Sequence, residues 1–156
     1  MKTVVTWRNG MPGSPVVIDA SIALRWLLPD PLHQACWALF SQIVESGMQI
    51  TAPALWRCEM NSGLAKAVHF NMLSSEDARR GLLQMAELGV HLISPDAEQN
   101  RQAFDWTLRL NRASAYDSYY LALAETLNCE FWTADSRLYH AGRDQGLAWI
   151  HHIEEI

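Results

Sequence analysis

The chain has 156 residues, of which 49% are hydrophobic and 19% charged, and its formal net charge is −5. These values fit one globular domain rather than a disordered chain, and no apolar run approaches the ~20 residues of a membrane-spanning helix. An acidic chain can bind nucleic acid only through local basic patches or metal ions. Three widely spaced cysteines, Cys36, Cys58 and Cys129, argue against a disulfide framework and for a reducing cytoplasm.

The first fifteen residues precede the first clear element, and we expect them to be an N-terminal extension or an edge element. Thr3 to Trp7 could add an edge strand, and Asn9 to Gly13 has the composition of a turn. The stretch lacks the continuous apolar core of a secretory signal. A single domain is therefore expected over residues 16–156.

Short apolar runs that alternate with helical patterns predict the fold. The expected strands are residues 16–19, 49–52, 90–93, 130–133 and 147–150. The expected helices lie near residues 22–27, 32–45, 55–69, 74–88, 95–110, 114–127 and 137–143. Because strands separated by helices form crossover connections, the chain is predicted to be an α/β protein, a three-layer α/β/α sandwich with a central parallel sheet of about five strands.

Two carboxylates come directly after predicted buried strands. Asp19 ends the run Val16-Val17-Ile18, and Asp135 follows Thr133-Ala134. Ligands of open α/β sheets bind outside the carboxyl ends of the strands, so both acids are candidate site residues. Each could instead only cap the helix that follows, since Asp is a favoured N-cap residue. Both interpretations remain open for both residues.

A third carboxylate, Glu59, lies in the helix after the second strand. Helical spacing places it on one face with Ser62, Gly63 and Lys66, opposite an apolar face. Gly63 is unusual because an interior glycine costs a helix ~1 kcal/mol relative to alanine. It could allow a neighbouring element or a substrate to come close. The alternative is that Glu59 is a solvated surface acid.

The fourth carboxylate, Asp117, lies near the start of a strongly apolar helix. Ser114, three residues earlier, could form a capping box with it. Ser118, Ala122 and Glu125 mark the expected outer face, and Asp117 lies about 100° away on the flank of the buried face. An acid in that position is more suggestive of function than an acid on the outer face.

Together the four acids are expected to meet at one edge of the sheet. Their mutual repulsion is unfavourable unless cations bind between them. Hard oxygen ligands without nearby His or Cys pairs favour Mg²⁺ or Mn²⁺. Such ions generate hydroxide from water and stabilise charge on a phosphodiester. The pattern therefore predicts a divalent metal site made by Asp19, Glu59, Asp117 and Asp135.

Four segments resemble the motifs of PIN-domain ribonucleases, over about Val16 to Ile150. They read Val-Val-Ile-Asp-Ala-Ser, Ala-Leu-Trp-Arg-Cys-Glu-Met, Tyr-Asp-Ser-Tyr-Tyr-Leu-Ala-Leu-Ala and Phe-Trp-Thr-Ala-Asp. The chain is most similar to VapC-type toxins of type II toxin–antitoxin systems. The resemblance implies an Mg²⁺- or Mn²⁺-dependent endoribonuclease that hydrolyses RNA phosphodiester bonds. It also implies that the four acids hold the metal and are the catalytic residues.

The resemblance further implies supporting residues and partners. Ser21 and Thr133 match hydroxyl positions of the family, where they would support the metal ligands. Members of the family form homodimers and bind a small cognate antitoxin that inserts into the active-site groove. Three basic residues near the acids could contact the RNA backbone, or could be solvated surface charges: Lys66, Arg112 and Arg137.

Two other functions are weighed against the ribonuclease. A catalytically weak PIN-fold protein that acts through partner binding is the main alternative, although all four acids are present. A phosphohydrolase of the haloacid-dehalogenase type needs a second Asp two residues after the first, and position 21 is Ser. The chain departs from the toxin pattern in the fifteen residues before its first strand, and Met11 is an alternative natural start.

Overall fold

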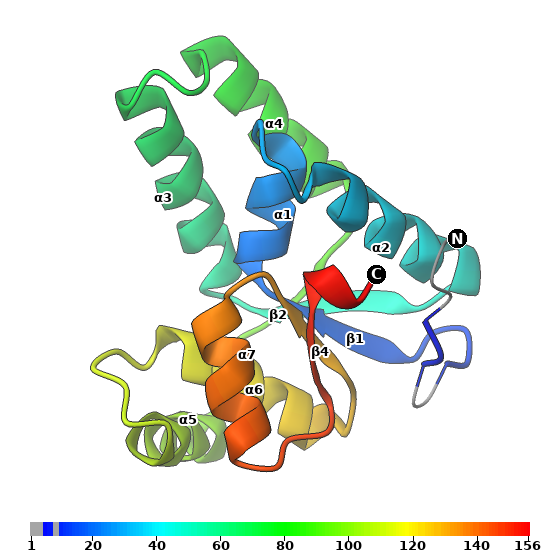
Figure 1. The fold of residues 1–156 in the computed structure, drawn as a ribbon, viewed down its shortest axis with the longest axis vertical. Coiled ribbons are helices and arrows are strands. Elements are labelled where there is room, and N and C mark those ends of the chain that lie inside the picture. The colour runs from blue at the N-terminus through cyan, green and yellow to red at the C-terminus, as the bar shows by residue number, and fades with distance from the viewer. Residues whose placement is uncertain (1–4, 8–9) are drawn as a thin grey trace.

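The computed structural model of the chain describes residues 5–7 and 10–156 and contains a central five-stranded sheet (Figure 1). Neighbouring strands are all parallel, in the spatial order β3-β2-β1-β4-β5. The strands are β1 (Pro15–Ile18), β2 (Gln49–Pro53), β3 (His91–Ile93), β4 (Phe131–Thr133) and β5 (Ile150–His152). The parallel sheet expected from the sequence is confirmed.

Helices cover both faces of this sheet. Figure 1 shows α1 to α4 on one side and α5 to α7 on the other, which confirms the three-layer α/β/α arrangement. The helices of the described residues are α1 (Ala20–Leu27), α2 (His33–Ser46), α3 (Trp56–His69), α4 (Ser75–Glu87), α5 (Ala97–Arg109), α6 (Tyr116–Leu127) and α7 (Ser136–Asp144), followed by the 3-10 helix η1 (Ile153–Glu155). No helix of the described residues combines the length and apolar character needed to cross a membrane.

Strand β1 lies at the centre of the sheet. Its residues Val16, Val17 and Ile18 are fully buried, because helices cover both faces of a parallel sheet. The chain moves outward from β1 through β2 to β3, and then returns past β1 to β4 and β5. The strand order therefore reverses between β1 and β4, and this switch point is where open α/β sheets bind ligands.

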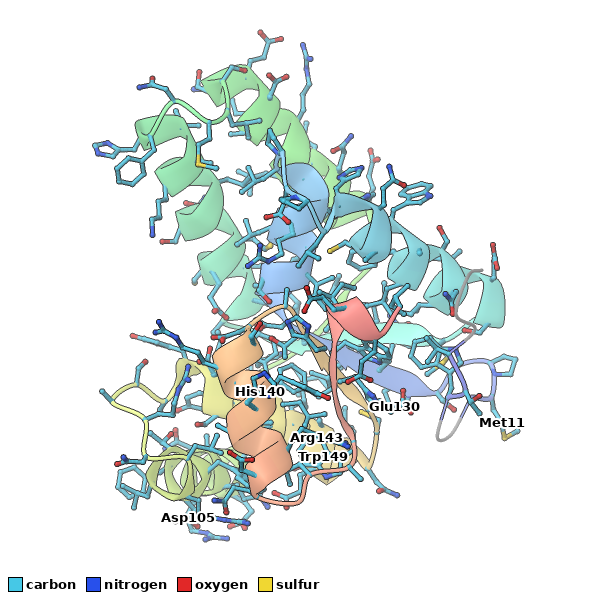
Figure 2. All side chains as sticks on the ribbon, viewed as in Figure 1. Met11, Asp105, Glu130, His140, Arg143 and Trp149 are labelled. Atoms are coloured by element: carbon cyan, nitrogen blue, oxygen red, sulfur yellow. The ribbon has the colours of Figure 1, made fainter. Side chains whose placement is uncertain are left out.

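The fifth strand is shifted from its predicted position, since it overlaps residues 147–150 only at Ile150. Gly146 has a positive φ of 79°, and the amide of Leu147 donates to the Gly142 carbonyl oxygen at 3.1 Å. These features end α7 after its C-cap residue Gln145, so the buried Leu147 lies in the turn that closes the helix instead of starting a strand. Figure 2 shows Arg143 and Trp149 at this end of α7.

Helix α6 is buried on more sides than its sequence predicts. Ser118 and Ala122, expected on its outer face, are fully buried, whereas Glu125 is exposed. Helix α5 packs along this face, and the Thr107 hydroxyl donates to Ser118 Oγ at 2.8 Å. The expected outer face was wrong because small residues there allow a second helix to approach.

The N-terminal segment adds no strand to the sheet within its described part. Residues 5–7 have no regular structure, while Thr3 and Val4 of the expected edge strand lie outside the described residues. The Val5 amide donates to Gln42 Oε1 of α2 at 3.0 Å. The Trp7 ring meets the Trp132 ring edge-on, with 6.0 Å between centroids. The segment therefore packs against α2 and β4.

Candidate active site

A cavity of about 520 Å³ lies at the carboxyl ends of β1 and β4. Helices α1, α3, α6 and α7 all begin near this edge of the sheet (Figure 1). The four acids singled out from the sequence all line the cavity: Asp19, Glu59, Asp117 and Asp135. The structure thus brings together every one of the predicted acidic residues.

Asp19 is the most deeply buried of these acids. The Asp19 amide donates to the Trp132 carbonyl oxygen, which places its side chain at the gap between β1 and β4. Asp19 Oδ2 accepts hydrogen bonds from Thr133 Oγ1 at 2.6 Å and Ser21 Oγ at 2.9 Å. Burial, together with the smaller effect of the nearby Asp117 charge, raises the pKa of Asp19 to about 6, although these hydrogen bonds act in the opposite direction.

Glu59 projects into the cavity from the first turn of α3. Its Oε1 accepts a hydrogen bond from the Tyr120 hydroxyl of α6 at 2.7 Å. Burial raises the pKa of Glu59 to about 7, and the charges of Asp19 and Asp117 act in the same direction. The solvated surface acid considered from the sequence is therefore excluded, because Glu59 faces other carboxylates in a partly buried site.

Asp117 and Asp135 share a single positive charge. Arg112, in the loop between α5 and α6, brings its Nη2 within 2.6 Å of Asp117 Oδ2 and 3.7 Å of Asp135 Oδ2. The side chains of these three residues are about one-quarter to one-third exposed, so their ion pairs are partly shielded from water. The negative charge of Asp117 and Asp135 is thus offset in part by the Arg112 guanidinium.

The two readings of the strand-tip acids turn out to be compatible. Asp19 caps α1 by accepting from the Ser21 amide at 3.3 Å. Asp135 caps α7, because its Oδ1 accepts from the amides of Arg137 and Leu138 at 2.8 and 3.1 Å. Each carboxylate caps its helix and still lines the cavity. The capping box of Asp117 with Ser114 does not form, since α6 starts after Ala115 without a side-chain cap.

The hydroxyl groups of Ser21 and Thr133 join the ends of β1 and β4. The Ser21 hydroxyl donates to Asp19 and accepts from the Ala134 amide at 3.0 Å. The Thr133 hydroxyl donates to Asp19 and accepts from the Asp135 amide at 3.0 Å. Both hydroxyls therefore hold the Asp19 carboxylate and the backbone next to Asp135 in fixed positions. Groups that orient metal ligands are expected to make such bonds.

The basic residues predicted near the site lie at its edges. Lys66 lines the cavity from the exposed side of α3. Arg137 is exposed and lines an adjoining cavity that shares Ser21 and Asp135. Arg112 instead lies against the acids. All three are therefore close to the cavity, while two of them remain free to meet solvent or ligand.

Gly63 allows a neighbouring helix to come close, one of the two roles considered for it. A Cβ built on Gly63 would lie 2.4 Å from Leu24 Cδ1, which is far inside van der Waals contact. Leu24 belongs to α1 and lines the cavity together with Gly63. The glycine thus sets how closely α1 and α3 pack beside the acids.

Two tyrosines of α6 belong to the site although the sequence did not single them out as functional. Tyr120 is buried and holds Glu59 through its hydroxyl, and helical spacing could have shown it on one face with Asp117. Tyr116 is 65% exposed and lines the cavity mouth. The apolar pattern of α6 alone did not distinguish these hydroxyl-bearing rings from core residues.

The donor set of the cavity fits a hard divalent cation. The raised pKa values of Asp19 and Glu59 indicate negative charge that the protein itself compensates poorly. Among residues 5–7 and 10–156 no three His, Cys, Asp or Glu side chains already form a group that could hold a metal ion. The cavity does offer carboxylate oxygens, the ligand type that Mg²⁺ prefers, from Asp19, Glu59, Asp117 and Asp135.

Comparisons with known proteins agree with this geometry. The family model of the PIN domain matches residues 16–144, and the chain belongs to the PIN-domain family. It is similar to Ribonuclease VapC9 of Mycobacterium tuberculosis, with 36% identity over 130 residues that cover 83% of this chain and 93% of the relative.

Two solved structures share the fold. VapBC2 from Rickettsia felis, bound to a DNA fragment from its promoter, gives a TM-score of 0.63 at 10% identity and covers 88% of this chain and 98% of that one. VapC20 of Mycobacterium tuberculosis, described as a sarcin-ricin loop cleaving toxin, gives a TM-score of 0.62 at 14% identity and covers 81% and 95%. At such identities the likeness concerns the fold.

Proposed function

We propose that this protein is an Mg²⁺- or Mn²⁺-dependent endoribonuclease, the toxin of a toxin–antitoxin pair. The convergence of four carboxylates on one cavity at the β1–β4 switch point carries the proposal. Its similarity to a ribonuclease named VapC9 supports RNA as the substrate class. Hydrolysis of a phosphodiester needs an activated water and a positive charge near the phosphate, and carboxylates that hold divalent ions provide both.

The four acids, Asp19, Glu59, Asp117 and Asp135, would hold the metal. A bound divalent ion supplies positive charge that activates water and offsets the charge that develops on the phosphodiester. Asp19 keeps a fixed orientation because Ser21 and Thr133 donate to it, so little reorganisation is needed. Glu59 has its Oε1 held by Tyr120, and its pKa near 7 lets it release a proton when a cation approaches.

RNA would reach the acids across the open side of the cavity. Lys66 lines the cavity and Arg137 lines the adjoining one, so both can contact backbone phosphates, and their positive charges offset the net acidity of the chain locally. Tyr116 presents an exposed ring at the mouth, and unpaired bases stack on such rings. These features suit a single-stranded or looped segment better than a continuous duplex.

Partner binding forms part of the same proposal. Relatives of this fold include VapBC2, whose name denotes a toxin together with its antitoxin. We expect a small cognate antitoxin to cover the acidic cavity and the chain to form a homodimer. An alternative, a PIN-fold protein that acts only through partner binding, is favoured if the acids bind no divalent ion.

Metal removal tests the function directly. The purified chain should cleave RNA in Mg²⁺ or Mn²⁺, lose cleavage in EDTA, and regain it when the ion is restored. Asp117→Asn should lower cleavage by ~100-fold or more, because it removes a charge from the cavity. Asp144→Asn, an exposed acid at the end of α7, is the matched control and should cleave like the wild type. Cleavage that persists in EDTA and in Asp117→Asn would overturn the proposal.

A further inference from the structure

Arg112 is held in place by the fold and not only by its ion pairs. It follows Asn111, whose φ is +50°, and its amide donates to the Thr107 carbonyl oxygen at 3.0 Å. This bond ties the loop to the last turn of α5, which itself packs along α6. The side chain therefore starts from a fixed backbone position beside Asp117.

The contacts of Arg112 use the oxygens that a cation would need. Oδ1 of Asp135 is engaged by the amides of Arg137 and Leu138, so Oδ2 is the oxygen turned toward Arg112. Asp117 likewise offers its Oδ2 to Arg112, at 2.6 Å. One nitrogen, Nη2, reaches both oxygens. A guanidinium and a divalent ion thus compete for the same two atoms.

We propose that Arg112 is a built-in counter-ion that a divalent metal must displace, and that it thereby sets the metal affinity of the site. The inference rests on the proposed function, because it takes the acids to be metal ligands. Without metal, Arg112 keeps Asp117 and Asp135 from repelling each other. With metal, its charge opposes that of the ion, and its guanidinium moves away from the carboxylates toward the cavity mouth.

The expected size of the effect follows from electrostatics. Two unit charges about 5 Å apart in a partly screened site interact strongly enough to change an affinity by roughly tenfold. A divalent ion near Arg112 meets at least this opposition. Removing the Arg112 charge should therefore strengthen metal binding by about tenfold, and the loss of two favourable contacts from the metal-free protein acts in the same direction.

Calorimetric titration of the metal-free protein with Mn²⁺ tests the inference without any RNA. Arg112→Gln should bind Mn²⁺ about tenfold more tightly than the wild type. Arg112→Lys should lie between them, because a lysine keeps the charge but cannot span two carboxylates as a guanidinium does. Arg79→Gln, which removes an exposed arginine of α4, should match the wild type. Equal or weaker Mn²⁺ binding by Arg112→Gln would overturn the inference.

A measurement on the wild-type chain keeps the test valid if a variant fails to fold. Titration with Mg²⁺, followed by NMR of the arginine side chains, should shift the Arg112 signal as its ion pairs break. A signal that stays unchanged while Mg²⁺ binds contradicts the displacement of Arg112 but leaves the metal site intact. Failure of both the wild type and Arg112→Gln to bind Mn²⁺ would instead overturn the proposed function together with this inference.

Discussion

The acidic cavity has two halves that hold negative charge in different ways. We call Asp19 and Glu59 the inner half and Asp117 and Asp135 the outer half. The inner acids are held by hydroxyl groups, and burial raises their pKa values to about 6 and 7. The outer acids are half-buried and lie against Arg112. Burial without a counter-charge thus distinguishes the inner half from the outer half.

The difference shows which half gains more from a metal ion. Outer carboxylates already have a cation, so a metal must replace an existing interaction there. Within the described residues, the hydrogen bonds to the inner carboxylates come from uncharged groups, and a bound cation would relieve the desolvation of these carboxylates. If the proposed metal binds, the outer half would therefore oppose entry of the ion, whereas the inner half would supply most of the favourable free energy of binding.

Substitution of an inner acid is expected to have the largest effect on activity. Asp19→Asn should lower RNA cleavage by ~100-fold or more, since it removes the charge held by Ser21 and Thr133. Circular dichroism should show a retained fold, with Asp144→Asn as the control. A variant with wild-type cleavage rates would show that the inner half is not part of the catalytic site.

Metal affinity and metal-free stability should depend on pH with opposite signs. Metal binding needs ionised carboxylates, so Mn²⁺ affinity should fall by ~100-fold between pH 8 and pH 5 as Glu59 and Asp19 bind protons. The folded pKa values are raised, so their contribution to stability is complete below pH ~4 and is lost as pH rises through 6 to 7. Calorimetric titrations and melting curves at each pH measure the two trends.

The variant Glu59→Gln tests how much of the pH dependence of metal-free stability comes from Glu59. An amide in place of the partly buried Glu59 charge should raise the metal-free melting temperature at pH 8 by a few degrees, or ~1 kcal/mol, after allowance for the exposed part of Glu59. At pH 5, where Glu59 is protonated, the variant and the wild type should melt alike. A stabilisation of the same size at both pH values would contradict the burial of an uncompensated charge.

Loss of the Thr133 hydroxyl, which donates to Asp19 of the inner half, should lower the stability of the fold. Thr133→Val removes the donor to Asp19 Oδ2 and the acceptor of the Asp135 amide, so the free energy of unfolding should fall by about 1–3 kcal/mol. Thr133→Ser keeps the hydroxyl and should lose less. Denaturant unfolding measures both variants, and a Thr133→Val variant as stable as the wild type would contradict the role of the hydroxyl.

The smallest expected effect concerns the hydroxyl that holds Glu59. Tyr120→Phe removes a hydrogen bond that lowers the Glu59 pKa, so the pH profile of Mn²⁺ binding should move to higher pH. Affinity at pH 7 should fall by a few-fold, in keeping with a loss of ~1 kcal/mol. Tyr119→Phe, which loses a hydroxyl contact with Asn100 on the helix surface, is the control. An unmoved pH profile would contradict the role of Tyr120.

Sequence patterns predicted the layers and the four acids because those features are local. An apolar run followed by a carboxylate indicates a strand tip, as at Asp19, and helical spacing put Glu59 beside Gly63. The contact of Tyr120 with Glu59 joins residues 61 positions apart, and no local pattern indicates such pairs. The burial of Ser118 likewise depends on where α5 packs, which the periodicity of α6 does not contain.

Arg112 and the fifth strand also show that local sequence patterns do not predict contacts between distant parts of the chain. The loop position of Arg112 was foreseen near the acids, but its contacts depend on side-chain geometry that composition does not fix. The apolar run 147–150 begins in the turn that closes α7, and only its last residue, Ile150, belongs to strand β5. An apolar run predicts that its residues are buried, but it does not show whether they belong to a helix end or to a strand.

The bond between Thr133 and Asp19 joins residues 114 positions apart. Protein chains are made from the N-terminus, and early segments emerge while later ones are still being added. Asp19 and Glu59 are therefore synthesised before β4 and Asp135, which complete the lining of the cavity. For the proposed ribonuclease, which is made on a ribosome surrounded by RNA, an unfinished chain has no complete active site. Synthesis itself thus delays toxicity until most of the protein has been translated.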